Sequence, residues 1–210
     1  TPGKCVIDDD MKHLMEKVMF SKLIILATPL YVDGVTGIMK DFMDRLIPLV
    51  DPHFEKDANG DWRHVKRYSS YPDIAVISNC GMPGRQHFQV LKLHFRRMAR
   101  NFHSEVTAEI YLYCGELLKN QVLILKPVIA KYRKTLRKAG EEVVKDGIIS
   151  QKTEEKLEKS LINANIYIKE AHKYWDRELG IYNRLMILQY FKHCTHFIHL
   201  CQSRGFTACL

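Results

Sequence analysis

The sequence lacks any run of eighteen or more uncharged apolar residues, which argues against a membrane-spanning helix. It also lacks the succession of basic, apolar and small residues that marks a secretory signal peptide. Its 6 cysteines fall at irregular intervals along 210 residues, unlike the dense framework of a small disulfide-stabilised protein. The simplest interpretation is that these cysteines are free thiols in a reducing compartment. Together with the missing apolar run, this predicts a cytoplasmic protein without a membrane span.

Motifs for nucleic-acid recognition are absent too, although the formal net charge is +8 and the pI is near 9.1. The basic residues are interleaved with acidic ones, as in KYRKTLRKAGEEVVKDG. This pattern is typical of the solvated face of a helix. We therefore expect no nucleic-acid partner.

Apolar segments of two kinds alternate along the first half of the chain. Short apolar runs predict buried strands within 22–29, 73–84 and 104–115. Helical spacing of apolar residues predicts helices over 8–20, 36–49 and 86–102. The polar segment 51–72 predicts a long surface loop or a small hairpin, and the pattern after 115 is helical to about 178. This alternation predicts an α/β domain with a parallel sheet of at least three strands.

Two loops rich in glycine and proline follow the first two predicted strands. They read ATPLYVDGVTG at 27–37 and SNCGMPGRQ at 78–86. Ligands of open α/β sheets bind at the carboxyl ends of the strands, where both loops lie. Tyr31 offers a flat face, Gly34 and Gly81 permit close backbone approach, and Asn79 has an amide that both donates and accepts. The two loops predict a site for a planar, hydrogen-bonding ligand, whereas either loop alone indicates only a turn.

Several spaced motifs together resemble the NADPH-dependent FMN reductase and iron–sulfur flavoprotein family. They are TPGKCVIDDDM, ATPLYVDGVTGIMKDFMDRLIPL, HVKRY and ISNCGMPGRQHF, and a looser likeness extends to HKYWDREL. The resemblance implies a flavodoxin-like three-layer fold, bound FMN, NAD(P)H as co-substrate and an electron acceptor such as a quinone, a metal centre or a protein. It also implies a homo-oligomer, because relatives often place FMN at a subunit interface.

The resemblance also assigns the cofactor-binding residues. In the family the two loops border the flavin ring, and the matching positions here are Pro29, Leu30, Tyr31, Val32, Asp33, Gly34, Asn79, Cys80 and Gly81. We expect no catalytic acid or base, because a flavin performs the electron chemistry itself. His87, which opens the helix after the second loop, is a candidate donor to a flavin oxygen or a surface residue.

One part of the family pattern is missing from the sequence. The Gly/Ser/Arg/Thr-rich loop that cradles the FMN phosphate after the family's first strand does not occur. We expect the family's N-terminal strands to be missing from this chain, as in a fragment of a longer protein. The alternative is a truncated, non-catalytic flavodoxin-like remnant that acts as a dimerisation or interaction module.

Cys5 occupies the position of the last cysteine of the cluster-binding motif in iron–sulfur members of the family. Such a cluster needs four thiolates, so Cys5 is a metal ligand only together with cysteines preceding Thr1. A lone thiol is the alternative interpretation.

The expected organisation has three parts. Residues 1–120 form a partial FMN-binding domain, residues 121–180 a helical C-terminal part of the same domain, and residues 181–210 a tail. The tail contains three of the cysteines and no acidic residue. It predicts an extra amphipathic helix or a read-through end. Cys194, His196, His199 and Cys201 are metal ligands by type, but their spacing is not a usual zinc pattern.

Overall fold

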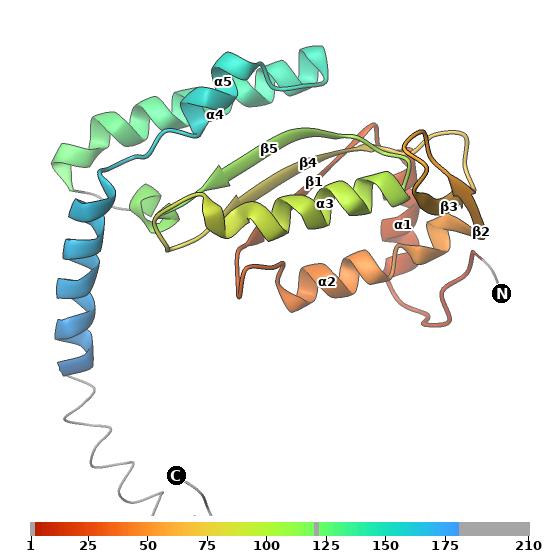
Figure 1. Cartoon of the computed structure of the whole chain (residues 1–210), viewed down its shortest axis with the longest axis horizontal. Coiled ribbons are helices and arrows are strands. Elements are labelled where there is room, and N and C mark those ends of the chain that lie inside the picture. The colour runs from red at the N-terminus through yellow and green to blue at the C-terminus, as the bar shows by residue number, and fades with distance from the viewer. Residues whose placement is uncertain (1–2, 120–121, 181–210) are drawn as a thin grey trace, which may run out of the picture. The chain divides into compact units, whose positions relative to one another are not determined.

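The predicted parallel sheet is present in the computed structural model, which describes residues 3–119 and 122–180. The chain divides into two units, Thr1–Leu161 and Ile162–Leu210, and the sheet belongs to the first. Three parallel strands lie in the order β1-β4-β5 (Figure 1). They are β1 (Leu23–Pro29), β4 (Asp73–Asn79) and β5 (Val106–Leu112). Each predicted strand is thus confirmed. The three strands lie in the sheet in the same order as in the chain.

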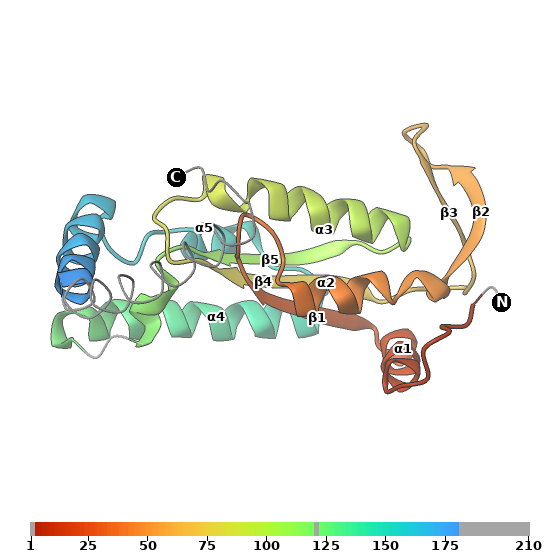
Figure 2. The same cartoon turned by 90° about the horizontal axis from the view of Figure 1, so that it is seen from below.

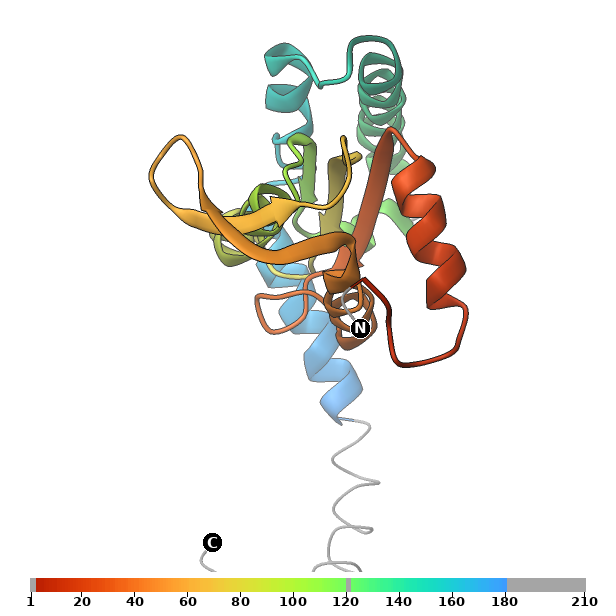
Figure 3. The ribbon, with the colours of Figure 1, turned by 90° about the vertical axis from the view of Figure 1, so that its right-hand side faces the viewer.

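Helices cover both faces of this sheet. They are α1 (Met11–Phe20), α2 (Gly37–Asp44), α3 (Gln89–Asn101), α4 (Lys126–Asp146) and α5 (Gln151–Leu157). In Figures 1 and 2, α2 and α3 lie on one side of the sheet and α4 on the other, and Figure 3 shows α1 beside β1. The α/β class with a parallel sheet between helical layers is therefore confirmed.

Each face of the sheet has its own apolar core. The larger core joins α1, α2 and α3 to the sheet and includes Leu26, Val76 and Phe95. The smaller core joins β5 to α4 and α5 through Leu112, Tyr132 and other apolar side chains. Successive side chains of a strand point to opposite faces, so alternate residues of β1 and β4, such as Leu26 and Val76, lie in the larger core, whereas Ile25 and Ile77 are exposed. Of the three strands, β5 contributes the residues of the smaller core.

Local signals in the sequence account for the ends of several helices. The Thr36 hydroxyl accepts a hydrogen bond from the backbone amide of Met39 at 3.4 Å, so Thr36 caps α2 as its position predicts. The Asp9 carboxylate accepts from the amide of Met11 at 3.0 Å and begins α1. Pro127 lies in the first turn of α4, where its missing N–H costs nothing, and Gly147 ends this helix with φ of 78°.

The polar segment 51–72 forms the hairpin that was one of its two predicted structures. Its strands are β2 (Val50–Lys56) and β3 (Trp62–Lys66), which pair antiparallel. The turn between them contains Gly60 at φ of 81°, a conformation that favours glycine. The Asp57 carboxylate accepts hydrogen bonds from the amides of Asn59 and Asp61 at 2.9 and 3.0 Å, which fixes the turn.

In the second unit, the described residues form a helix over 164–180. The Asn163 side chain accepts hydrogen bonds from the amides of Asn165 and Ile166 and so caps this helix. The predictions for 181–210, including the cysteine and histidine metal ligands, lie outside the described residues. None of the helices in the described part of the chain has the length and apolarity needed to cross a bilayer.

Candidate functional site

The two predicted ligand-binding loops lie side by side at the carboxyl ends of β1 and β4. Pro29 is paired with Asn79 in the register of the sheet. The next residue, Leu30, donates its backbone amide to the carbonyl oxygen of Asn79 at 2.8 Å. The structure therefore brings the first loop directly against the second, at the edge where α/β sheets bind their ligands.

The first loop is a tight turn that presents its tip to solvent. The amide of Tyr31 donates to the carbonyl of Gly34 at 3.2 Å, and the amide of Gly34 donates back at 3.0 Å. Val32 and Asp33 between them have φ of 50° and 53°. This is the geometry of a type I′ turn, which glycine and asparagine ordinarily occupy. A β-branched residue with positive φ is strained, and such strain gathers at ligand-binding sites.

This turn decides which backbone amides remain available to a ligand. The amides of Leu30, Tyr31, Gly34 and Cys80 already donate to protein carbonyls. Among the loop amides of 30–34, those of Val32 and Asp33 donate to no described residue. The side chain of Val32 is fully exposed and that of Tyr31 is 65% exposed. Two open donors beside a flat aromatic ring therefore form the accessible part of the first loop.

Asn79 provides the matching polar group of the second loop. Its exposed side-chain amide has no hydrogen-bond partner among the residues that the structure describes. Gly115 packs against it: a Cβ on Gly115 would lie 2.8 Å from both Cβ and Nδ2 of Asn79. Only glycine permits this approach, so Gly115 fixes where the Asn79 amide lies.

A third loop, after β5, thus belongs to the same edge of the sheet, and sequence reasoning missed it. The amide of Gly115 donates to the carbonyl of Cys80 at 2.9 Å, and the amide of Cys80 donates to the carbonyl of Leu112 at 3.0 Å. The signal in the sequence was the Cys-Gly pair that ends the third predicted segment, 104–115, a strand end of the same kind as those that marked the other two loops.

An apolar cavity of about 330 Å³ adjoins Asn79 on the face of the sheet covered by α4. Pro29, Asn79, Leu118, Tyr132 and Leu136 contribute to its lining. The Tyr132 hydroxyl is buried and has no hydrogen-bond partner among the described residues. Burial raises the pKa of Tyr132 to about 12, so this hydroxyl stays protonated at neutral pH. A mostly apolar cavity with a few polar groups is typical of a ligand site.

Cys80 and Cys114 have the character of structural rather than reactive residues. Both thiols are buried. Burial raises the pKa of Cys80 and raises that of Cys114 to about 12, which keeps both thiols protonated and poorly nucleophilic. The Cys80 thiol donates to the carbonyl of Met82 at 3.3 Å. Cys80 therefore shapes the second loop, and Gly81 follows it next to Glu116.

His87 links the second loop to the tip of the first. Its Nδ1 lies 3.6 Å from the Asp33 carboxylate, and its side chain is mostly buried. Because Asp33 belongs to the strained turn, this contact joins the residues after the second loop to the first loop. His87 is thus placed to position the turn.

Cys5 lies apart from these loops, beside Arg45. The guanidinium donates to the Cys5 sulfur at 3.3 Å and to Asp9 at 2.7 Å. A backbone hydrogen bond from Ile7 and the Arg45 contact lower the pKa of Cys5, which favours the thiolate. In the described ranges, no group of three or more His, Cys, Asp or Glu residues is arranged to hold a metal ion. One thiolate does not bind an iron–sulfur cluster, so we do not assign one to these residues.

Comparison with known proteins gives a family match for part of the chain. Residues 1–67 match the model of the NADPH-dependent FMN reductase family. The iron–sulfur flavoprotein of Archaeoglobus fulgidus is 48% identical over 46 residues, which are 22% of this chain and 21% of that protein. The chain therefore spans about a fifth of the length of this curated relative.

Two solved structures resemble the chain more distantly. An apo NADH:FMN oxidoreductase has a TM-score of 0.37 at 18% identity, covering 54% of this chain and 50% of that protein. The Trp repressor binding protein of Bacillus subtilis has a TM-score of 0.41 at 21% identity, covering 54% of this chain and 65% of that protein. The sequence match lies in the N-terminal part, which includes the first loop and its turn. Over residues 1–67 this chain matches the NADPH-dependent FMN reductase family, as its motifs indicated.

Proposed function

We propose that this chain is the ring-binding part of an FMN-dependent NAD(P)H oxidoreductase that passes electrons to a quinone, a metal centre or another protein. The observation that carries the proposal is the hydrogen bond of 2.8 Å between Leu30 and Asn79, which places the two family loops edge to edge. The family match over residues 1–67 supplies the chemistry to expect there.

The residues at this edge fit the isoalloxazine ring of FMN. The ring has a polar edge that accepts hydrogen bonds and a flat apolar body. The amides of Val32 and Asp33 are open donors, and the Asn79 side chain both donates and accepts. The exposed Tyr31 ring offers a surface for stacking. We assign no residue to the FMN phosphate.

When bound, FMN supplies hydride and electron transfer, and the protein has to bind, orient and tune it. Donors aimed at the polar edge of the ring stabilise negative charge that develops there. The close contact of buried Gly115 with Asn79 limits where the Asn79 amide can lie. The proposed chemistry needs no acid or base from the protein.

The test is an activity assay on the full 210-residue chain with NADPH and NADH in separate reactions. We expect oxidation of the nicotinamide, followed by its absorbance, only when FMN and an acceptor such as a quinone are both present. Heat-denatured protein is the control for the direct reaction of the nicotinamide with free flavin. Rates equal to this control with both nicotinamides would contradict the proposed activity.

The alternative of a non-catalytic interaction module is favoured by one observation. Within the described residues, β1 pairs with β4 on one edge and has no strand partner on the other. A groove of about 680 Å³ follows that edge, between apolar side chains of α1 and α2. An interaction module predicts a stable oligomer that neither binds FMN nor oxidises NAD(P)H, so the same assay separates the two functions.

A further inference from the structure

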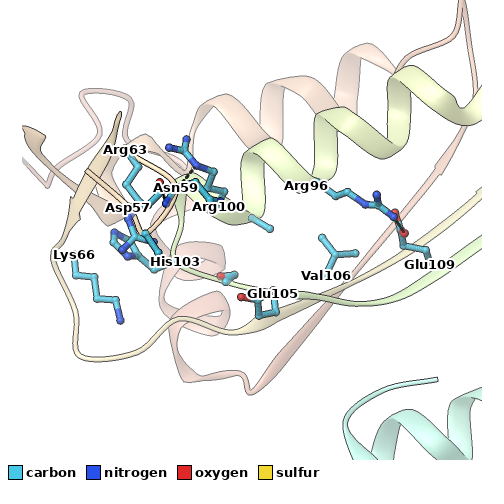
Figure 4. Close-up of a pocket in the computed structure, with 13 residues that line it drawn as sticks. Asp57, Asn59, Arg63, Lys66, Arg96, Arg100, His103, Glu105, Val106 and Glu109 are labelled. Carbon is cyan, nitrogen blue, oxygen red and sulfur yellow. Dashed lines mark hydrogen bonds and ion pairs between the residues drawn. The ribbon is translucent and has the colours of Figure 1, made fainter. Parts of the chain in front are cut away.

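A second cavity, of about 690 Å³, lies near the amino end of β5, away from the proposed flavin site. Its walls come from the β2–β3 hairpin, the end of α3 and the first half of β5 (Figure 4). Neither the loop at 27–37 nor the loop at 78–86 contributes to its lining. Polar and charged side chains dominate its lining, whereas the cavity beside Asn79 is mostly apolar.

Ion pairs build the two ends of this cavity. Arg100 Nε lies 2.6 Å from the Asp57 carboxylate, and both side chains are largely buried. At the other end, Arg96 Nη2 lies 2.6 Å from the Glu109 carboxylate. Figure 4 shows Asp57, Asn59 and Arg100 gathered at one end and Arg96 with Glu109 at the other. The first pair fixes the hairpin against α3 and the second fixes α3 against β5, so contacts within the protein hold the walls of the cavity in place.

His103 contributes a buried ring nitrogen that makes no hydrogen bond among the described residues. Its side chain is only 2% exposed, and its ring stacks on Tyr71 with an interplanar angle of 21°. Its Nε2 lies 2.7 Å from the carbonyl oxygen of His64, so in the neutral ring Nε2 carries the proton. In that neutral form Nδ1 is a lone-pair acceptor; it is buried and makes no hydrogen bond among the described residues, and the nearest carboxylate, that of Glu55, lies 3.9 Å away.

Arg100 contributes an unused donor to the same wall. Its Nη2 is buried and makes no hydrogen bond within the described part of the chain, with the Asp61 carboxylate 3.8 Å away. Buried polar groups are almost always paired, so an unpaired donor and an unpaired acceptor in one wall indicate a missing partner. A hydroxyl group accepts from Arg100 and donates to His103 at once. Because neighbouring atoms cover both nitrogens, we expect both side chains to turn slightly on binding.

Two charged side chains complete the polar lining of the second cavity. The Lys66 ammonium and the Glu105 carboxylate both line the cavity, and neither has a charged partner among the residues described. An ammonium of this kind binds phosphate or carboxylate as a point charge, and a free carboxylate accepts hydrogen bonds from hydroxyl groups.

We propose that this cavity binds a small hydroxylated anion of the sugar-phosphate class. Lys66 binds the phosphate, Glu105 accepts from the sugar hydroxyls, and one hydroxyl bridges Arg100 and His103. This site is independent of the flavin proposal, since neither needs the residues of the other.

The test uses calorimetric titration of the full chain with ribose 5-phosphate, and with ribose and inorganic phosphate separately. We expect ribose 5-phosphate to bind at least tenfold more tightly than either half, because each half loses the contacts of the other. The Lys66→Met variant should weaken binding by about tenfold, as expected for one lost charge-assisted hydrogen bond. Lys134→Met, which removes the same charge from an exposed position on α4, should leave the affinity unchanged.

A nuclear magnetic resonance signal tests the buried pair directly. Ribose 5-phosphate should shift the Nδ1 resonance of His103, and it should do so in the absence of flavin. Phosphate that binds as tightly as ribose 5-phosphate would reduce the site to a simple anion patch and overturn the proposal. Absence of binding at millimolar ribose 5-phosphate would overturn it as well. So would an equal loss of affinity in the Lys66→Met and Lys134→Met variants.

Discussion

Replacing Gly115 by alanine should weaken FMN binding by about tenfold, which corresponds to about 1.4 kcal/mol. The added Cβ would lie 2.8 Å from two atoms of Asn79, closer than van der Waals contact allows. The Asn79 side chain therefore has to move, and the polar group that it offers to the ring moves with it. Flavin fluorescence measures the affinity, and circular dichroism confirms that the variant is folded.

Gly140 in α4 is the matched control for this substitution. No atom lies within 4 Å of where its Cβ would be. The Gly140→Ala variant should bind FMN as the original chain does, and it should be about 0.5–1 kcal/mol more stable because alanine favours a helix. A folded Gly115→Ala variant with unchanged FMN affinity would show that Asn79 is not part of the flavin site.

Replacing Phe95 by alanine should lower the free energy of unfolding by about 3–5 kcal/mol. Phe95 on α3 is 0% exposed and belongs to the larger core between this helix and the sheet. The loss includes the transfer free energy of the ring and the cost of the cavity that remains. Because domains are stable by only about 5–15 kcal/mol, the variant should be partly unfolded near physiological temperature.

Leu93 on the same helix is 61% exposed and serves as the control. The Leu93→Ala variant should change the free energy of unfolding by no more than about 0.5 kcal/mol. Urea unfolding, followed by circular dichroism, compares the two variants. If both variants lost the same free energy of unfolding, α3 would not bury Phe95 against the sheet.

The sheet and its helices were predictable because their signals are local. The apolar runs that begin at residues 22 and 73 are short and lie between helical patterns, so a buried strand is the structure that they favour. The structure has strands at Leu23–Pro29 and Asp73–Asn79. The ends of elements were less predictable. The helix expected over 36–49 ends at Asp44, and a short 3-10 helix follows at Ile47–Leu49. Pro48 explains this break, since it has no N–H to donate to the carbonyl of Asp44 and its ring would clash with that carbonyl in an α-helix.

The hairpin shows why tertiary contacts escape such reasoning. The polar segment 51–72 gave two alternatives, a loop or a hairpin. The hairpin is anchored to α3 by the ion pair between Asp57 and Arg100, which are 43 residues apart in sequence. No local pattern indicates that pairing. The second cavity depends on this pairing, so a site there could not be expected from the sequence alone.

The meeting of the two Gly/Pro loops at one edge of the sheet was predictable, since the carboxyl ends of parallel strands lie together there. That these loops bind a flavin stays a prediction. The reciprocal hydrogen bonds of Tyr31 and Gly34 depend on backbone geometry, so the sequence could not show that they occupy two of the amides expected to bind the ring. The contact between Gly115 and Asn79 joins residues of different strands and was equally hidden.

The most direct measurement of the central claim is a titration of the ¹⁵N-labelled chain with FMN, followed by amide resonances. We expect the largest shifts at the backbone amides of Val32 and Asp33 and at the side-chain amide of Asn79, because these are the open donors of the two adjoining loops. The amides around Lys66, at the second cavity, should not move. Shifts that avoid the two loops, or no shift at saturating FMN, would contradict the account.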